Sequence, residues 1–234
     1  MSESGPEAVA ERSHGGPSLI GSGHERDTAQ ITDEAELREL LGEVNPRAAN
    51  KDRPALHARD REWIGLSPFV VLSTSDAAGN CDASPKGDPA GFVRVLDAHT
   101  IAVPERPGNR RADGYRNILV NPHVGLIFLI PGRNETLRIN GSARLVRDAP
   151  YFDEMVVRGH RPILAVEVAI EQIFFHCAKA FLRSHLWQPE QWPDDTLPSA
   201  ARLVKEVQSG VTETVEELEH YYSPEVYGQK LYQG

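Results

Sequence analysis

Cysteine is scarce in this chain, which has two cysteines, Cys81 and Cys177, among 234 residues. Two thiols exclude a disulfide-stapled scaffold and a cysteine-rich zinc or iron–sulfur site. Both lie in or beside apolar runs, so we expect buried free thiols and a reducing, cytoplasmic compartment. No run approaches the roughly 18 apolar residues of a membrane-spanning helix, and the N-terminus lacks the charged and apolar regions of a secretory signal.

Positive charge is also in deficit, with 25 Lys and Arg against 34 Asp and Glu and a net charge of −9. Proteins that bind nucleic acid or anionic membranes need a basic face to neutralise phosphates. We therefore expect neither kind of partner, although a local basic pocket for a small anion remains compatible with this balance.

Large apolar residues are almost absent from residues 1–28, which are rich in Gly, Ser, Glu and Pro. Such a segment cannot bury enough surface to offset its ordering entropy, so we predict a disordered tail. We expect residues 29–234 to form a single domain. Its first helix should be capped by Thr32 or Asp33, and a second should run from Pro54 to about Leu66.

From Pro68 the pattern becomes that of β-strands. Six or more short strands with few helices between them favour a mainly β, antiparallel barrel with flanking helices. The run 123–130 is almost wholly apolar, as in a strand buried on both faces, and the strand from 136 should bend near Gly141. The other expected strands span 68–75, 81–85, 91–97, 100–104 and 162–175, with helices at 110–120, 149–158 and beyond about 177.

Cations gather in two loops of this acidic chain. SPKG contributes Lys86, and PERPGNRR contributes Arg106, Arg110 and Arg111 just before a predicted helix. Arginines beside a helix N-terminus provide the donors that a phosphate group needs. The alternative is that these are ordinary solvated surface charges.

The segment with SPKGDP, RPGN, RNILVNP and LRINGSA resembles the flavin-binding split-barrel family typified by pyridoxamine 5′-phosphate oxidase. It is most similar to an FMN-dependent branch whose substrates are not assigned, and the likeness covers roughly residues 30–225. The resemblance implies a six-stranded antiparallel split barrel that forms a homodimer. It also implies FMN in the clefts between the two subunits.

The resemblance also implies which positions contact FMN. It assigns the flavin phosphate to a polar-basic-basic triplet, the flavin to two strands, and further contacts to a strand that reaches across the dimer interface. Lys86 would bond the flavin, its phosphate or the substrate. The implied cofactor-binding residues are Asp82, Ala83, Ser84, Lys86, Pro104, Glu105, Asn109, Arg110, Arg111, Thr136 and Arg138.

Departures from the family pattern change the expected substrate. Cys81 or its neighbours stand where these oxidases carry an arginine, and VVRGHRPILAV lacks their phosphate-gripping Tyr, Arg and Ser set. We therefore expect an FMN-dependent oxidoreductase that acts by hydride transfer at flavin N5 on another small molecule, with NAD(P)H as a candidate donor. The alternatives are a non-catalytic flavin carrier, or a barrel that binds a deazaflavin or haem, the last with His160 or His176 as axial ligand.

A second basic cluster occupies residues 174–190. Helical spacing would place His176, Lys179 and Arg183 on one face. That face is either the solvated side of a packed helix or a surface that closes over the flavin and binds an anionic substrate. Lys86 and Arg183 are the catalytic candidates, and Lys179, Arg183 and Trp187 the substrate candidates. His176 and Cys177 lack a third ligand, so we expect no metal.

Overall fold

The computed structural model describes residues 29–193 and 197–233, so the predicted disordered tail lies outside the described residues. The chain divides into two units, one ending at Asn45 and the other beginning at Pro46. The first contains α1 (Glu34–Leu41). Its N-cap is Asp33, whose carboxylate accepts a hydrogen bond from the Glu36 amide at 2.9 Å. The sequence predicted this cap.

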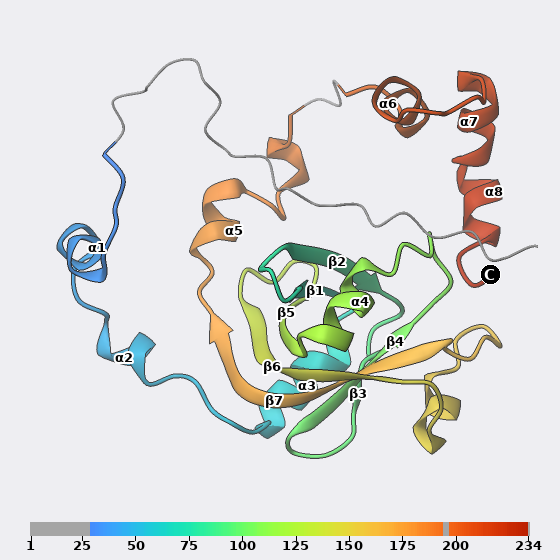
Figure 1. The fold of residues 1–234 in the computed structure, drawn as a ribbon. Coiled ribbons are helices and arrows are strands. Elements are labelled where there is room, and N and C mark those ends of the chain that lie inside the picture. The colour runs from blue at the N-terminus through green and yellow to red at the C-terminus, as the bar shows by residue number, and fades with distance from the viewer. Residues whose placement is uncertain (1–28, 194–196, 234) are drawn as a thin grey trace, which may run out of the picture. The chain divides into compact units, whose positions relative to one another are not determined.

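The second unit contains a β-sheet with short helices around it (Figure 1). Its strands are β1 (Phe69–Ser75), β2 (Cys81–Gly87), β3 (Arg94–Val95), β4 (Thr100–Glu105), β5 (His123–Leu129), β6 (Thr136–Val146) and β7 (Leu164–His176). Its α-helices are α2 (Pro46–Ala49), α3 (Ala58–Leu66), α4 (Asp113–Val120), α5 (Lys179–Ser184), α6 (Ala200–Val207), α7 (Val215–Tyr221) and α8 (Pro224–Gln229). The 3-10 helices are η1 (Pro150–Met155) and η2 (Pro189–Gln191).

All strand pairs are antiparallel, and the order is β2-β1-β5-β6-β7-β4-β3. The expected mainly β fold with flanking helices is therefore present, but the sheet has seven strands rather than six. Its edge strands β2 and β3 do not pair in the described chain, so the sheet is open rather than a closed barrel. The strand predicted over 91–97 shortens to two residues because Phe92 and Val93 are both buried, which alternation in a strand forbids.

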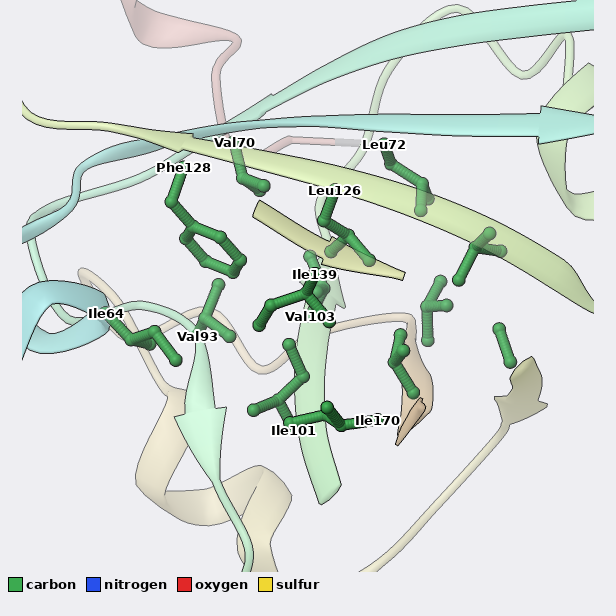
Figure 2. Close-up of a cluster of buried hydrophobic side chains, with 14 of the residues drawn as sticks. Ile64, Val70, Leu72, Val93, Ile101, Val103, Leu126, Phe128, Ile139 and Ile170 are labelled. Carbon is green, nitrogen blue, oxygen red and sulfur yellow. The ribbon is translucent and has the colours of Figure 1, made fainter. Parts of the chain in front are cut away.

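The sheet curls around one hydrophobic core to which every strand except β2 and β3 contributes alternate side chains. In Figure 2, Val70 and Phe128 lie on one side of this cluster and point towards Ile101 and Ile170 on the other. Because both sides of the curl share one core, the outer face of most strands is left to solvent or to other partners.

The prediction that residues 123–130 are buried on both faces is wrong. Val124, Leu126 and Phe128 point into the core, whereas the side chain of Ile127 is 40% exposed. The strand has an ordinary alternation of inward and outward side chains. The sequence did not reveal it because the outward residues Gly125, Ile127 and Leu129 are small or apolar as well.

Gly141 marks an irregularity in β6, as the sequence predicted. The register between β6 and β7 shifts between Asn140 and Gly141. A Cβ at Gly141 would overlap the Ala169 carbonyl oxygen of β7 and lie 3.0 Å from its carbon. Only glycine permits this close approach of two backbones.

Three further expectations are corrected. The helix predicted from Pro54 begins at Ala58, because His57 and Asp60 form a capping box. The helix predicted over 149–158 is the shorter 3-10 helix η1, whose Phe152 and Met155 pack on the outer side of the sheet. Both cysteines are exposed rather than buried, since Cys81 begins an edge strand and Cys177 follows the last strand.

No helix among the described residues has the length and apolar character to cross a membrane.

Candidate functional site

A pocket of about 570 Å³ lies between the edge strand β2, the end of β4 and the loop that leads into α4. This volume falls within the range of small-molecule and cofactor sites. The helix α4 packs against β1, β2 and β6 beside it (Figure 1). The lining residues are Leu72, Asp82, Ala83, Ser84, Pro85, Lys86, Gly87, Pro104, Glu105, Arg106, Pro107, Gly108, Asn109, Arg110, Arg111, Ala112, Asp113, Gly114 and Tyr115.

The loop between β4 and α4 has an unusual backbone. Arg110 and Ala112 adopt the left-handed conformation, with φ of 60° and 59°. Residues with a Cβ rarely adopt it, and such strain concentrates at functional sites. The Asn109 side chain supports the loop by accepting a hydrogen bond from the Arg111 amide at 3.1 Å.

The N-terminus of α4 is open towards the pocket. Its N-cap, Ala112, has no capping side chain, and the residues that follow it, Asp113 and Gly114, line the pocket. The first N–H groups of a helix have no partner within the helix and carry partial positive charge. This end of α4 therefore offers donors to an anion.

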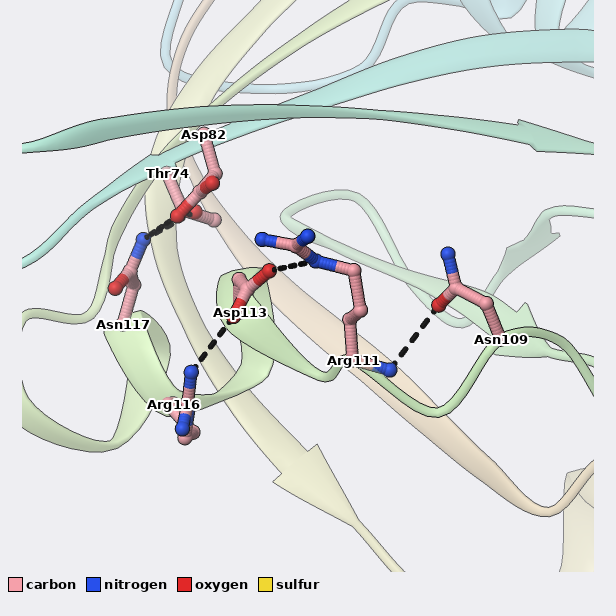
Figure 3. Close-up of polar contacts among 7 residues, drawn as sticks. All are labelled: Thr74, Asp82, Asn109, Arg111, Asp113, Arg116 and Asn117. Carbon is pink, nitrogen blue, oxygen red and sulfur yellow. Dashed lines mark hydrogen bonds and ion pairs between the residues drawn. The ribbon is translucent and has the colours of Figure 1, made fainter. Parts of the chain in front are cut away.

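Two arginines flank this helix end. Arg110 is exposed and has no hydrogen bond or ion pair among the described residues. The Arg111 Nε donates to Asp113 at 2.7 Å, and Arg116 donates to the other oxygen of the same carboxylate at 2.6 Å (Figure 3). The two guanidinium groups hold the pKa of Asp113 below its ordinary value. Arg111 is thus oriented while its terminal amino groups remain available to a ligand.

Arg106, the remaining cation of the loop, has a different role from the one predicted. Its Nε donates to Asp88 at 2.6 Å, and its terminal nitrogens donate to the carbonyl oxygens of Met155 and His160. The Tyr232 hydroxyl donates to the other Asp88 oxygen at 2.5 Å. Because each of its three nitrogens donates to a protein acceptor, Arg106 anchors the start of the loop rather than offering charge to a ligand.

Lys86 lies in the pocket with two polar partners. Its Nζ donates to Glu105 at 2.7 Å and to the Tyr115 hydroxyl oxygen at 2.6 Å. Burial, followed by the hydrogen bond and charge of Glu105, raises the pKa of Tyr115 well above its ordinary value, so the phenol stays neutral. Glu105 and Tyr115 hold the Lys86 ammonium group at a fixed place on the pocket wall.

Asn117 fastens α4 to the two neighbouring strands. Its buried amide donates to Asp82 on β2 at 2.7 Å and to Thr74 on β1 at 3.1 Å (Figure 3). Asp82 and Ala83 also border a second hollow of about 390 Å³, which includes Cys81 and His123. The strand β2 therefore separates two recesses.

The structure brings most of the predicted cofactor-binding residues into the pocket. Nine of the eleven line it: Asp82, Ala83, Ser84, Lys86, Pro104, Glu105, Asn109, Arg110 and Arg111. Thr136 and Arg138 do not, because β6 places them opposite His176 and Phe174 of β7. Tyr115 and Asp113 line the pocket without having been predicted, although the helical spacing after Arg111 could have indicated them.

The predicted helix face of His176, Lys179 and Arg183 does not exist. His176 is the last residue of β7, paired with Thr136, and α5 begins only at Lys179. The strand predicted to end at Phe175 continues to His176, because Thr136 of β6 pairs with it. Lys179 and Arg183 are exposed and lie outside the pocket.

Trp187, the third substrate candidate, makes packing contacts. Its Nε1 donates to the Arg133 carbonyl oxygen at 2.7 Å, and its ring stacks on Phe181 with 5.9 Å between centroids. Within the described chain, no three His, Cys, Asp or Glu side chains are grouped so as to hold a metal ion.

Solved structures with a similar chain path share low sequence identity with this chain. A Lactobacillus delbrueckii structure assigned to the pyridoxamine 5′-phosphate oxidases is 24% identical, covering 53% of this chain and 98% of its own, with a TM-score of 0.42. HupZ from Group A Streptococcus is 20% identical, covering 51% and 93%, with a TM-score of 0.42. An FMN-binding protein from Syntrophomonas wolfei is 14% identical, covering 51% and 89%, with a TM-score of 0.39.

No curated protein matches the sequence. The family comparison does give a match, which runs from Leu56 to Cys177 and is described as pyridoxamine 5′-phosphate oxidase. The matched segment is more than half of the chain and contains β1 to β7, α4 and all the residues that line the pocket. The chain therefore belongs to the pyridoxamine 5′-phosphate oxidase family.

Proposed function

We propose that this protein binds FMN in the pocket between β2, β4 and α4 and acts as an FMN-dependent oxidoreductase on a small molecule. The observation that carries the proposal is the uncapped end of α4 with Arg110 and Arg111 beside it. Helix N–H groups and arginine forks together are the donors that a phosphate monoester requires. Membership in the pyridoxamine 5′-phosphate oxidase family supports the same cofactor.

The donor set fits FMN from one end of the pocket to the other. Arg110, Arg111 and the first N–H groups of α4 would hold the phosphate, and Asn109 would keep the loop in place. The edge strand β2, from Asp82 to Lys86, would lie along the planar ring system, since an edge strand has backbone groups free for polar contacts. The pocket is therefore cationic at one end and strand-lined at the other.

Lys86 would act as a fixed cation beside the ring system. FMN supplies hydride transfer when it is bound. Glu105 and Tyr115 orient the Lys86 ammonium group. It can then donate towards a ligand oxygen with little further loss of side-chain entropy. Glu105 also balances the charge of Lys86, so the phosphate end of the pocket remains the more positive one.

The remaining assignments follow as parts of the proposal. We propose a homodimer in which the cofactor lies between subunits, because Thr136 and Arg138 can reach FMN only from a second copy. Arg183 and Lys179 would likewise approach a substrate only by way of a partner. His160 and His176, the candidate axial ligands for haem, do not line this pocket.

FMN titration of the full-length protein tests the binding part. The wild type should bind one FMN per chain and quench flavin fluorescence. Arg110→Ala and Arg111→Ala should each weaken FMN binding about tenfold, because each removes a charge-assisted contact. Arg116→Ala is the matched control, since Arg116 shares Asp113 with Arg111 but does not line the pocket. Equal losses in all three variants would contradict the phosphate assignment.

Reduction of the bound flavin tests the enzymatic part. Anaerobic addition of NADH or NADPH to the FMN-loaded protein should bleach the flavin absorption faster than it bleaches free FMN. A loaded protein that neither accepts electrons from a donor nor passes them on would be a flavin carrier, and the oxidoreductase assignment would then be wrong.

A further inference from the structure

A second cationic site lies on the outer face of the sheet, away from the pocket. The register of β6 and β7 pairs Arg138 with Phe174 and Thr136 with His176. The residues on either side of Arg138, Leu137 and Ile139, are fully buried in the core. Because side chains alternate along a strand, Arg138 and the pair Phe174 and His176 share the opposite, outward face.

The segment before α3 adds Lys51 to the same face. Arg53 joins the edge of β7 at Ile173 through two backbone hydrogen bonds of 3.0 and 2.8 Å. This bridge places the Lys51 Nζ 4.5 Å from the centroid of the Phe174 ring. The same ammonium group donates to the Phe175 carbonyl oxygen at 3.3 Å. Lys51 is therefore held in place by backbone pairing.

Three basic side chains surround one aromatic ring as a result. The Arg138 guanidinium carbon lies 5.4 Å from the Phe174 centroid, and the His176 ring lies 6.3 Å from it. Lys51 and Arg138 are half-buried, and neither pairs with a carboxylate among the described residues. Asp52, next to Lys51 in the chain, accepts a hydrogen bond from Gln172. We call Lys51, Arg138 and His176 the Phe174 cluster.

Within the described ranges, no direct ion pair neutralises the positive charges of this cluster. Burial, and then the charges of Lys51 and Arg138, lower the pKa of His176 below its ordinary value. His176 is consequently neutral at pH 7, and the cluster carries two positive charges. The two like charges beside the buried Phe174 ring repel each other unless an anion joins them. By contrast, the half-buried cations that line the pocket, Lys86 and Arg106, each have a carboxylate partner.

We propose that the Phe174 cluster is a binding site for a small tetrahedral dianion of the phosphate or sulfate type. A dianion matches the two fixed charges, and the imidazole of His176 adds a donor to the same ligand. The Phe174 ring forms an apolar floor that keeps the two cations apart and excludes water from beneath them. The cluster shares no residue with the pocket of its own chain. It does include Arg138, which we proposed to reach FMN from a second copy, so FMN is one of the competitors in the test.

Inorganic sulfate is the appropriate probe because its charge stays constant across the pH range in which histidine titrates. The imidazole resonances of the full-length protein, with His176 assigned through His176→Gln, should shift saturably with sulfate at constant ionic strength. Acetate at the same ionic strength should bind at least about tenfold more weakly, since it carries half the charge. Sulfate binding should also tighten as the pH falls below the ordinary pKa of histidine, because His176 then gains its proton beside Lys51 and Arg138.

Substitutions separate binding from folding. Lys51→Gln and Arg138→Gln should each weaken sulfate binding about tenfold, whereas Lys51→Arg and Arg138→Lys, which keep the charge, should retain most of it. Arg202→Gln on α6 is the control for the removal of an exposed cation and should change nothing. Thermal unfolding of each variant verifies that it is folded, and the charge-retaining pair keeps the test valid if a glutamine variant is not.

Three results would overturn the proposal. One is a His176 response to sulfate no larger than its response to chloride. Another is sulfate binding that survives the loss of both Lys51 and Arg138. The third is displacement of sulfate by FMN, which would make the cofactor's phosphate the occupant of the cluster.

Discussion

The ion pair that anchors the loop between β4 and α4 offers a sharp test of how the pocket is held together. Asp88 is 1% exposed and Arg106 is 11% exposed, and their Oδ2–Nε distance is 2.6 Å. Asp88→Asn removes the charge that neutralises Arg106 while it keeps the size of the side chain. Breaking a buried ion pair by removing one partner destabilises proteins by about 3–5 kcal/mol.

The expected loss here is smaller than that range. Arg106 keeps two carbonyl acceptors, at 2.6 and 3.1 Å, and its guanidinium remains 5.8 Å from the Tyr232 ring. We therefore expect about 2–3 kcal/mol, below the full penalty because these contacts persist. For a domain of this size, that free energy corresponds to a fall in Tm of about 5–10 °C.

Thermal unfolding followed by circular dichroism, with and without FMN, measures the effect. Tyr232→Phe, which removes one hydrogen bond to the same carboxylate, should lower Tm by less than Asp88→Asn does. Asp153→Asn, which breaks an exposed pair with Arg161, should leave Tm almost unchanged. Equal Tm values for Asp88→Asn and Asp153→Asn would refute the anchoring role of Arg106.

Two other consequences of the structure are open to measurement. Gly141→Ala should destabilise the sheet by about 3 kcal/mol or more, since the new Cβ would overlap the Ala169 carbonyl oxygen. Urea unfolding measures this loss of stability. The control is Gly132→Ala, at a positive φ with open space around it, which should have a smaller effect. A tolerated Gly141→Ala would mean that β6 and β7 do not approach as closely as described. His176 should titrate below its ordinary pKa by NMR, and Lys51→Gln should raise that pKa. Because the folded-state pKa of His176 is lowered, its contribution to the free energy of unfolding is present above the unfolded-state pKa and is lost as the pH falls through the folded-state pKa. An unchanged His176 titration in Lys51→Gln would contradict the proposed effect of the Lys51 charge on this pKa.

The sequence predicted the local parts of the fold well. The cap at Asp33, the bend at Gly141 and most of the strands depend on short-range signals such as side-chain hydrogen bonding, glycine geometry and β-branched runs. It failed where tertiary pairing decides the outcome. The segment through His176 stays extended because β6 supplies a partner, and the apolar run of β5 still exposes Ile127 because one of its faces lies outside the core.

The candidate site shows the same division. The resemblance indicated the loop with Arg110 and Arg111, but charge alone could not tell a free arginine from an anchored one. Arg106 differs from them only because Asp88, which is 18 residues away, and Tyr232 come to it in the folded chain. The Phe174 cluster could not be foreseen either, since it joins Lys51, Arg138 and His176 from three separated segments.

A comparison of FMN with riboflavin tests the central claim most directly, since the two ligands differ only by the phosphate. The wild type should bind FMN about a hundredfold more tightly than riboflavin, with each of Arg110 and Arg111 contributing about tenfold. The double variant Arg110→Ala/Arg111→Ala should lose most of this preference while its affinity for riboflavin stays unchanged. Equal affinities of the wild-type protein for the two ligands would contradict the assignment of this loop as the phosphate site.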